Sequence, residues 1–151
     1  MLISELSGDE SLDFLARMRF GRLACAKGDQ PYIIPIFFAY DDHRVYCAST
    51  LGRKIEWMRT NPLVCLECEE LTTDRVWASL IVFGRYEELP NLPENESARR
   101  VAERLFQKHP MWWEPATAPL AGHERRPPIV FRIHVDSLTG RRTIHEPRPR
   151  A

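Results

Sequence analysis

The chain has 151 residues and a mass of 17.6 kDa, with 44% hydrophobic and 28% charged side chains. This length suits one globular domain with a hydrophobic core and is too short for two. The 21 basic and 21 acidic side chains leave a formal charge of zero. No overall field would therefore draw the protein onto nucleic acid or an anionic membrane.

Hydropathy and cysteine usage favour a cytoplasmic protein. The longest apolar run, residues 33–40, is interrupted by a proline and is far shorter than the roughly 18 residues of a membrane-spanning helix. The first ten residues carry three acidic and no basic side chains, which is the wrong order for a secretory signal. Cys65 and Cys68 are three residues apart on a predicted strand, so we expect reduced thiols on opposite faces and no metal site.

The first half of the chain predicts one helix followed by strands. Ser7 and Glu10 form a capping-box pattern ahead of a helical apolar spacing, which indicates a helix over residues 9–18. Pro35 restricts its strand to an edge, a bulge or a position with an unpaired N–H. Three strands joined by short turns are expected as an antiparallel meander, over residues 21–26, 32–40 and 44–49.

The second half alternates helices with long strands. Gly84 is expected to mark a bulge or a close approach of two backbones. Trp112 and Trp113 lie in a Pro-rich loop, residues 111–128, where they would serve as a dimer anchor or as a lid. Helices are predicted over residues 52–60 and 94–109, and strands over residues 63–69, 76–87 and 129–135.

These elements predict a mainly β fold. Six strands with inserted helices suit a small antiparallel barrel, and their order lacks the regular strand and helix alternation of a doubly wound sheet. We expect a single domain over residues 1–140 and a frayed tail over residues 141–151, which is rich in Arg and Pro.

The segment from Ser49 to Lys54 is the strongest candidate for a binding site. The hydroxyls of Ser49 and Thr50 end a strand, Gly52 makes the turn, and Arg53 and Lys54 enter the first turn of a helix. Cations there are unfavourable unless an anion arrives, so the segment predicts a phosphate cradle. The alternative is a solvated helix start whose cations pair with the acids of residues 67–70.

Two further segments carry more apolar surface than a one-faced strand needs. Residues 32–38 must be covered on both sides, by the barrel interior and by a partner chain or a flat ligand. Trp77 and Ser79 share one face of another strand, where an aromatic ring beside a hydroxyl would line a heterocycle or an interface.

The order of these motifs resembles the pyridoxamine 5′-phosphate oxidase-related family, above all its flavin-binding branch with the nitroimidazole-resistance-type reductases. The resemblance covers residues 19–89 and the last strand. The motifs that carry it are Gly21-Arg22-Leu23-Ala24, residues 31–36, Val45-Tyr46, residues 49–54, Asn61-Pro62, and residues 79–84 followed by Glu87.

The resemblance implies a homodimeric six-stranded antiparallel split β-barrel with peripheral helices and with FMN at the subunit interface. By the same resemblance, Ser49, Thr50, Arg53 and Lys54 would hold the FMN phosphate. Backbone of Ile34, Pro35 and Ile36 would lie along the isoalloxazine edge, and Trp77 and Ser79 would approach the ring from the other subunit.

The function implied is an FMN-binding oxidoreductase that passes electrons or hydride from a reduced nicotinamide to a small organic acceptor. The Arg and His pattern with which the oxidase itself grips its substrate is not recognisable after Val135, so vitamin B6 oxidation is not expected. The alternatives are a flavin-binding protein without turnover, or a barrel that uses the deazaflavin F420 or haem, with His134 as a weak axial candidate. No catalytic acid or base, nucleic acid or membrane partner is expected.

Overall fold

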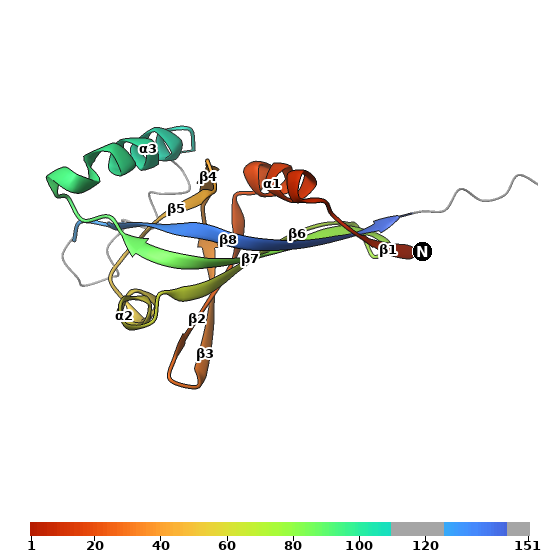
Figure 1. Cartoon of the computed structure of the whole chain (residues 1–151), viewed down its shortest axis with the longest axis horizontal. Coiled ribbons are helices and arrows are strands. Elements are labelled where there is room, and N and C mark those ends of the chain that lie inside the picture. Colours follow the sequence, from red (N-terminus) through yellow and green to blue (C-terminus); the bar gives the residue numbers. More distant parts are fainter. Residues whose placement is uncertain (110–125, 145–151) are drawn as a thin grey trace, which may run out of the picture.

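The computed structural model describes residues 1–109 and 126–144, and its strands form one large antiparallel sheet with three α-helices around it (Figure 1). In chain order the elements are β1 Leu2–Glu5, α1 Gly8–Arg17, β2 Phe20–Lys27, β3 Gln30–Phe37, β4 Ala39–Asp41, β5 Arg44–Ser49, α2 Arg53–Thr60, β6 Leu63–Thr73, β7 Val76–Glu88, the 3₁₀ turn η1 Pro93–Asn95, α3 Glu96–Gln107 and β8 Ile129–Ile144. The predicted split barrel is confirmed as an antiparallel sheet, with eight strands in the described residues where six were expected.

The two strands at the ends of the sheet follow each other in the chain. The order is β3-β2-β6-β7-β8-β5-β4, with β1 pairing onto β8. Strands β3 and β4 therefore lie at opposite ends of the order although only Phe38 separates them in the chain. Phe38 is fully buried, and its N–H donates to the carbonyl oxygen of Arg19 at 2.8 Å. The chain turns at this residue from one edge of the sheet to the other.

The prediction of one strand over residues 32–40 was therefore wrong, and so was the meander. β3 pairs with β2, whereas β5 pairs with β4 and β8 instead of β3. The expected edge position of Pro35 is confirmed, because β3 ends the strand order.

Strand β8 is much longer than the strand predicted over residues 129–135, and it includes part of the predicted C-terminal tail. It pairs with β7 along most of its length, and its last four residues also pair with β1. The frayed tail was therefore wrong for residues 141–144, while residues 145–151 lie outside the described residues. The β1 strand itself, Leu2–Glu5, was missed.

Gly84 marks both features that the sequence predicted for it. The β7–β8 register shifts between Phe83 and Gly84. A Cβ atom at Gly84 would lie 2.3 Å from the carbonyl oxygen of His134 and 2.6 Å from Cγ2 of Ile133, so no larger residue fits there without a shift of backbone.

Helices α1 and α2 contribute side chains to the main core. Ser7 caps α1, with its Oγ accepting from the N–H of Glu10 at 3.1 Å as predicted. Leu15 of α1 and Ile55 and Met58 of α2 are fully buried in the main core. Figure 1 shows α2 on the opposite side of the β7–β8 ladder from α1 and α3.

Helix α3 covers a second, smaller core that also contains residues of β4 and β5. The predicted helix over residues 94–109 begins as the 3₁₀ turn η1 and becomes α-helical at Glu96. Most of the predicted loop, including Trp112 and Trp113, lies outside the described residues. Within the described residues, none of the helices has the length and apolar character needed to cross a bilayer.

Candidate functional site

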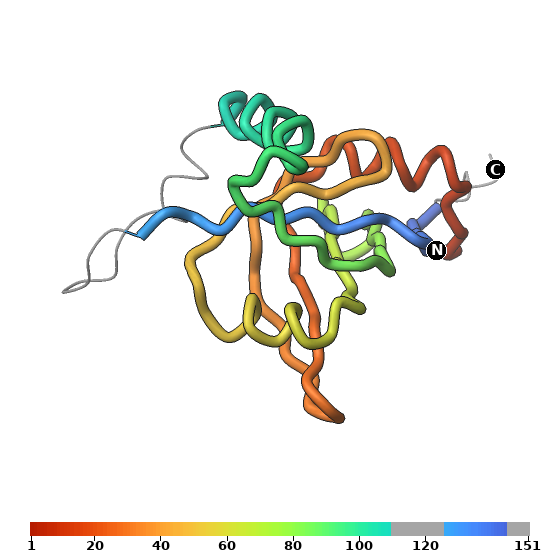
Figure 2. Tube along the Cα trace, turned by 60° about the vertical axis from the view of Figure 1, so that its left-hand side comes forward, coloured from red at the N-terminus to blue at the C-terminus, as the bar shows by residue number. Residues whose placement is uncertain are grey.

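Helix α2 begins without a side-chain cap. Gly52 occupies its N-cap position in an extended conformation, and the first intrahelical hydrogen bond runs from the N–H of Glu56 to the Gly52 carbonyl at 3.1 Å. The N–H groups of residues 53–55 therefore have no acceptor within the helix. A Cβ atom at Gly52 would meet nothing within 4 Å, so the N-cap position itself is open. Figure 2 shows α2 beside the β2–β3 hairpin.

Two cations stand at this helix start. The guanidinium carbon of Arg53 lies 5.5 Å from the ring centroid of Tyr32, and that ring packs at 5.5 Å against Trp57. Lys54 is half-buried, and burial lowers the pKa of its ammonium, with the side chains of Cys47 and Cys25 acting against this effect. A partly desolvated cation of this kind is stabilised by an arriving anion.

The alternative in which Arg53 and Lys54 pair with nearby acids was wrong. Glu70 pairs with Arg17, and Arg22 pairs with Glu67 and Glu69 at 3.2 Å each. Neither Arg53 nor Lys54 forms an ion pair with any residue in the described part of the chain, whereas Arg59 at the end of α2 pairs with Glu88.

The two predicted hydroxyls differ in their surroundings. Ser49 is buried, and its Oγ donates to the carbonyl oxygen of Thr50 at 3.0 Å, whereas Thr50 is exposed. The Thr50 hydroxyl is therefore the one open to solvent at the end of β5. Thr50, Arg53, Lys54 and the uncapped N–H groups are the hydrogen-bond donors that this part of the chain offers to an anion such as phosphate.

The predicted residues of β3 divide between the two faces of the strand. Ile36 is buried in the core and Ile34 is half-buried, whereas Pro35 is exposed on the other side. Since β3 ends the strand order, one side of its backbone faces away from β2. The expected contact of Ile34, Pro35 and Ile36 with a flat ligand would use this backbone edge, and it stays a prediction.

The exposed face of β3 continues across the sheet as an apolar row. Ile33, Ala24, Cys65 and Phe83 are cross-strand neighbours on β3, β2, β6 and β7. Ile33 is 61% exposed and Phe83 45% exposed. A groove of about 410 Å³ is lined by Ala24, Cys65 and Phe83, among other residues. Cys65 is half-buried on this face while Cys68 is buried in the core, which confirms their predicted opposite orientation. We call these four residues the outer row.

Trp77 and Ser79 lie far from the cradle within one chain. Ser49 pairs with Ile129 at one end of β8, whereas Ser79 pairs with Arg141 near the other end. The twelve residue steps from Ile129 to Arg141 correspond to about 40 Å measured along the strand. Trp77 and Ser79 instead line a separate cavity of about 500 Å³ with Arg141 and neighbouring residues of β1 and β8.

Sequence reasoning missed a charged cluster on β7 and β8. Arg132 donates from Nε and Nη2 to the Glu87 carboxylate at 3.1 Å each, and from Nη1 to the Tyr46 hydroxyl at 3.4 Å. His134 also bonds that carboxylate through Nε2, so the weak axial-ligand candidate is engaged. Burial alone would raise the pKa of Glu87, yet the hydrogen bonds from Arg132 and His134 hold it below its ordinary value. The sequence signal that could have indicated this cluster is the period-two spacing within residues 130–134, which puts Arg132 and His134 on the same face of the strand.

A metal centre has no support in the described residues. Across residues 1–109 and 126–144, no three His, Cys, Asp or Glu side chains come together as a candidate metal-binding group.

Comparison with known proteins places the chain in a family. The family model for pyridoxamine 5′-phosphate oxidase matches residues 7–142. An uncharacterized protein of Rhizobium meliloti (strain 1021) is 40% identical over 144 residues, which is 93% of this chain and 95% of the relative.

Solved structures agree. An FAD-binding protein from Mesorhizobium loti is 42% identical over 95% of this chain and 100% of that chain, with a TM-score of 0.81. An FAD-binding protein from Mycobacterium smegmatis shares the fold at 21% identity and a TM-score of 0.66, over 95% of this chain and 98% of that chain. The protein therefore belongs to the pyridoxamine 5′-phosphate oxidase family.

Proposed function

We propose that this protein binds a flavin nucleotide and uses it to pass reducing equivalents from a reduced nicotinamide to a small organic acceptor. The observation that carries the proposal is the α2 helix start, where uncapped N–H groups adjoin Thr50, Arg53 and Lys54 in the chain and neither cation has an acidic partner in the described residues. FMN and FAD both carry a phosphate on the ribityl chain, and this cradle suits that group. The FAD-binding relative from Mesorhizobium loti supports a flavin ligand.

The residues of the chain divide the binding work. The α2 helix start would hold the phosphate, and the backbone at the edge of β3 would lie along the isoalloxazine ring. Bound flavin would supply two-electron redox chemistry, while the protein supplies binding, orientation and exclusion of water. With this division of work, hydride transfer would require no catalytic acid or base from the protein side chains.

A homodimer would complete the site. Ser79 and the cradle residue Ser49 pair with positions of β8 that are twelve residue steps apart, about 40 Å along the strand. In a two-fold dimer built on the outer row, Trp77 and Ser79 of one subunit would approach the ring bound by its partner. The exposed apolar side chains of Ile33 and Phe83 support burial of this face against a second copy.

The proposal is tested by titrating the purified full-length protein with FMN and with FAD, following visible absorption and flavin fluorescence. Retention of flavin through gel filtration at the elution volume of a dimer is the expected result. Reduction of the bound flavin by a reduced nicotinamide, followed by reoxidation that an organic acceptor accelerates over oxygen alone, would establish turnover. Failure to bind either flavin would overturn the proposal, and binding without accelerated reoxidation would overturn the oxidoreductase part.

A further inference from the structure

The cavity that Trp77 and Ser79 line, here called the Trp77 cavity, has a volume of about 500 Å³, in the range of small-molecule pockets. Ser79 lies opposite Arg141 on β8, and Arg141 lies opposite Glu5 on β1. Cross-strand partners, and residues two apart on a strand, share one face of a sheet. One face therefore supplies six residues of the lining, which are Glu5, Trp77, Ser79, Ile81, Thr139 and Arg141.

The polar side chains of this face have no partner within the described part of the chain. There the side chains of Glu5, Ser79, Thr139 and Arg141 form neither a hydrogen bond nor an ion pair, although Glu5 and Arg141 are cross-strand neighbours. The next residue, Arg142, differs, because it forms an ion pair with Glu10 at 2.8 Å. The donors and the carboxylate of the Trp77 cavity are therefore available to a ligand.

Trp77 offers a flat surface whose backbone is held in place. Its N–H donates to Oγ1 of Thr143 at 3.1 Å, which ties β7 to β8 at this position. The half-buried indole makes no ring–ring or cation–π contact among the described residues, whereas Trp57 packs at 5.5 Å against Tyr32. Ile81 adds an apolar side chain, 40% exposed, on the same face. Aromatic rings stack on a surface of this kind.

The charges of the cavity favour a carboxylate over a phosphate. Among its lining residues Arg141 is the one cation and Glu5 the one acid, so their charges sum to zero. A guanidinium binds a carboxylate through two parallel hydrogen bonds. A bound carboxylate would leave the cavity with one excess negative charge, whereas a phosphate dianion would leave two beside the Glu5 carboxylate.

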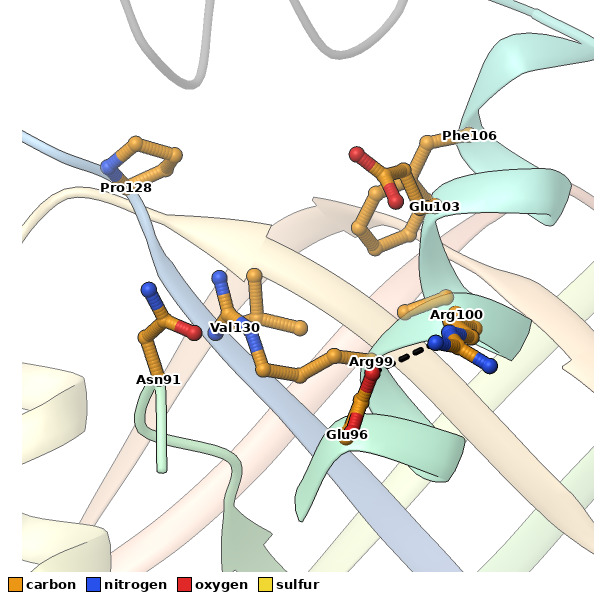
Figure 3. Close-up of a pocket in the computed structure, with 9 residues that line it drawn as sticks. Asn91, Glu96, Arg99, Arg100, Glu103, Phe106, Pro128 and Val130 are labelled. Atoms are coloured by element: carbon orange, nitrogen blue, oxygen red, sulfur yellow. Dashed lines mark hydrogen bonds and ion pairs between the residues drawn. The ribbon is translucent and has the colours of Figure 1, made fainter. Parts of the chain in front are cut away.

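The cavity beside α3, which has a volume of about 470 Å³, differs in its cations (Figure 3). Figure 3 shows Arg100 paired with Glu96 of the same helix. Nη1 of Arg99 donates to the carbonyl oxygen of Leu89. Both arginines are thus engaged by the chain itself, whereas Arg141 is not, and we therefore assign the ligand to the Trp77 cavity.

We propose that the Trp77 cavity binds a flat aromatic monocarboxylate, with its ring on the indole of Trp77 and its carboxylate on the guanidinium of Arg141. The cavity lies within one chain, so this binding needs neither flavin nor a second subunit. The role of the ligand rests on the proposed function. In the proposed dimer, Trp77 and Ser79 of one subunit approach the flavin ring of the partner, so the small organic acceptor belongs to this class of carboxylates.

The test titrates 2-naphthoate and its neutral isostere 2-naphthamide into the full-length protein by isothermal titration calorimetry. The native protein should bind 2-naphthoate about three- to tenfold more tightly than 2-naphthamide, as for a charged contact that solvent partly screens. Arg141→Gln should remove this difference without changing the 2-naphthamide constant. Trp77→Leu should weaken both probes about fivefold or more, because both stack. Glu5→Gln should strengthen 2-naphthoate about two- to fivefold by removing a like charge.

Arg142→Gln is the matched control, since Arg142 pairs with Glu10 and does not line the Trp77 cavity. It should leave both constants unchanged, and thermal unfolding of each variant checks the fold. Equal binding of the two probes, binding of neither, or native affinity of Arg141→Gln for 2-naphthoate would overturn the carboxylate site.

Flavin-loaded protein tests the role of the ligand. 2-Naphthoate should shift the visible absorption of the bound flavin, and Arg141→Gln should raise the half-saturating concentration by the factor found in calorimetry. Binding of 2-naphthoate without a shift would overturn the acceptor role. Flavin binding with failure of both probes would overturn this inference and leave the proposed function standing. Carboxylate binding in a protein that binds neither flavin would instead overturn the proposed function and, with it, the acceptor role.

Discussion

The guanidinium of Arg53 lies over the ring of Tyr32, 5.5 Å from its centroid, at the point where α2 begins beside β3. This cation–π contact orients the Arg53 side chain. In the described residues, no acidic side chain forms an ion pair with it. The proposed phosphate cradle thus contains a cation that is already oriented before any ligand arrives.

Replacing Arg53 and Lys54 together by alanine is expected to weaken flavin binding by about 2–5 kcal/mol, or roughly 30- to 5000-fold. The reason is the loss of two charged hydrogen-bond donors to phosphate. Titration of the purified double variant measures the effect. Arg17→Ala serves as the control, because Arg17 pairs with Glu70 away from the helix start. An unchanged dissociation constant in the double variant would rule out the phosphate assignment.

Ile33→Asp is expected to break the proposed homodimer. Ile33 is 61% exposed in the outer row, and a carboxylate placed there would be desolvated against a partner without a counter-charge. We expect the dimer dissociation constant to rise by at least about a hundredfold, as for an interface hot spot. Light scattering after gel filtration measures the mass. Leu71→Asp, at a 70% exposed position outside the row, should leave the mass unchanged, and a dimeric Ile33→Asp protein would contradict the interface.

Gly84→Ala is expected to lower the free energy of unfolding by about 1–3 kcal/mol or more, because its new Cβ atom would collide with the His134 carbonyl at 2.3 Å. Chemical denaturation compared with the native protein measures the loss. Gly8→Ala is the control, since a Cβ atom at Gly8 meets nothing within 4 Å. Equal destabilisation by the two substitutions would show that packing at the bulge is not the cause.

The Glu87 cluster predicts an acid-sensitive contribution to stability. Since hydrogen bonds from Arg132 and His134 hold the pKa of Glu87 below its ordinary value, folding favours the carboxylate. The contribution is therefore full above the unfolded carboxyl pKa near 4.3 and is lost as pH falls through the lower folded-state pKa. Glu87→Gln should cost about 1–2 kcal/mol at pH 7, at the low end for charged hydrogen bonds because the side chain is 38% exposed.

Urea unfolding of the native protein and of Glu87→Gln at pH 7 and pH 3 measures this difference. The difference in unfolding free energy between the two proteins should be smaller at pH 3 than at pH 7, because pH 3 lies below the ordinary carboxyl pKa near 4.3 and the unfolded chain is then protonated. Glu96→Gln, which removes an exposed pair with Arg100, is the control and should have little effect at either pH. A gap for Glu87→Gln that stays constant with pH would contradict the prediction.

Local chemistry was enough to predict most of the elements. The capping pair Ser7 and Glu10 located α1, and Asn61-Pro62 marked the end of α2. The break at Phe38 left no such signal, because residues 32–40 contain no glycine or turn dipeptide at that point. Burial of Phe38 and its hydrogen bond to Arg19 create the corner, and both are tertiary effects. β1 was missed for the same reason, since it is held by the end of β8.

The candidate site was predictable as a set of residue types but not as a geometry. Arg53 and Lys54 could be recognised from the sequence because cations in the first turn of a helix oppose its dipole. Only the structure shows that Arg17 and Arg22 form ion pairs with the acidic side chains of β6. Only the structure shows that the Ser49 hydroxyl donates to the carbonyl oxygen of Thr50. The cavity beside α3 is lined by residues from two separate parts of the sequence, residues 91–106 and 128–130, so no local sequence pattern could predict it.

The pairing of β8 with β1, β5 and β7 has a consequence for synthesis on the ribosome. The hairpins β2–β3 and β6–β7 are local and can pair as soon as they emerge. The barrel cannot close around them until residues 129–144 have been translated, because this one strand joins the N-terminal strand to both halves of the sheet. Nascent chains that stop before β8 would expose the apolar faces of β5 and β7, so folding to completion has to follow, rather than accompany, translation of most of the chain.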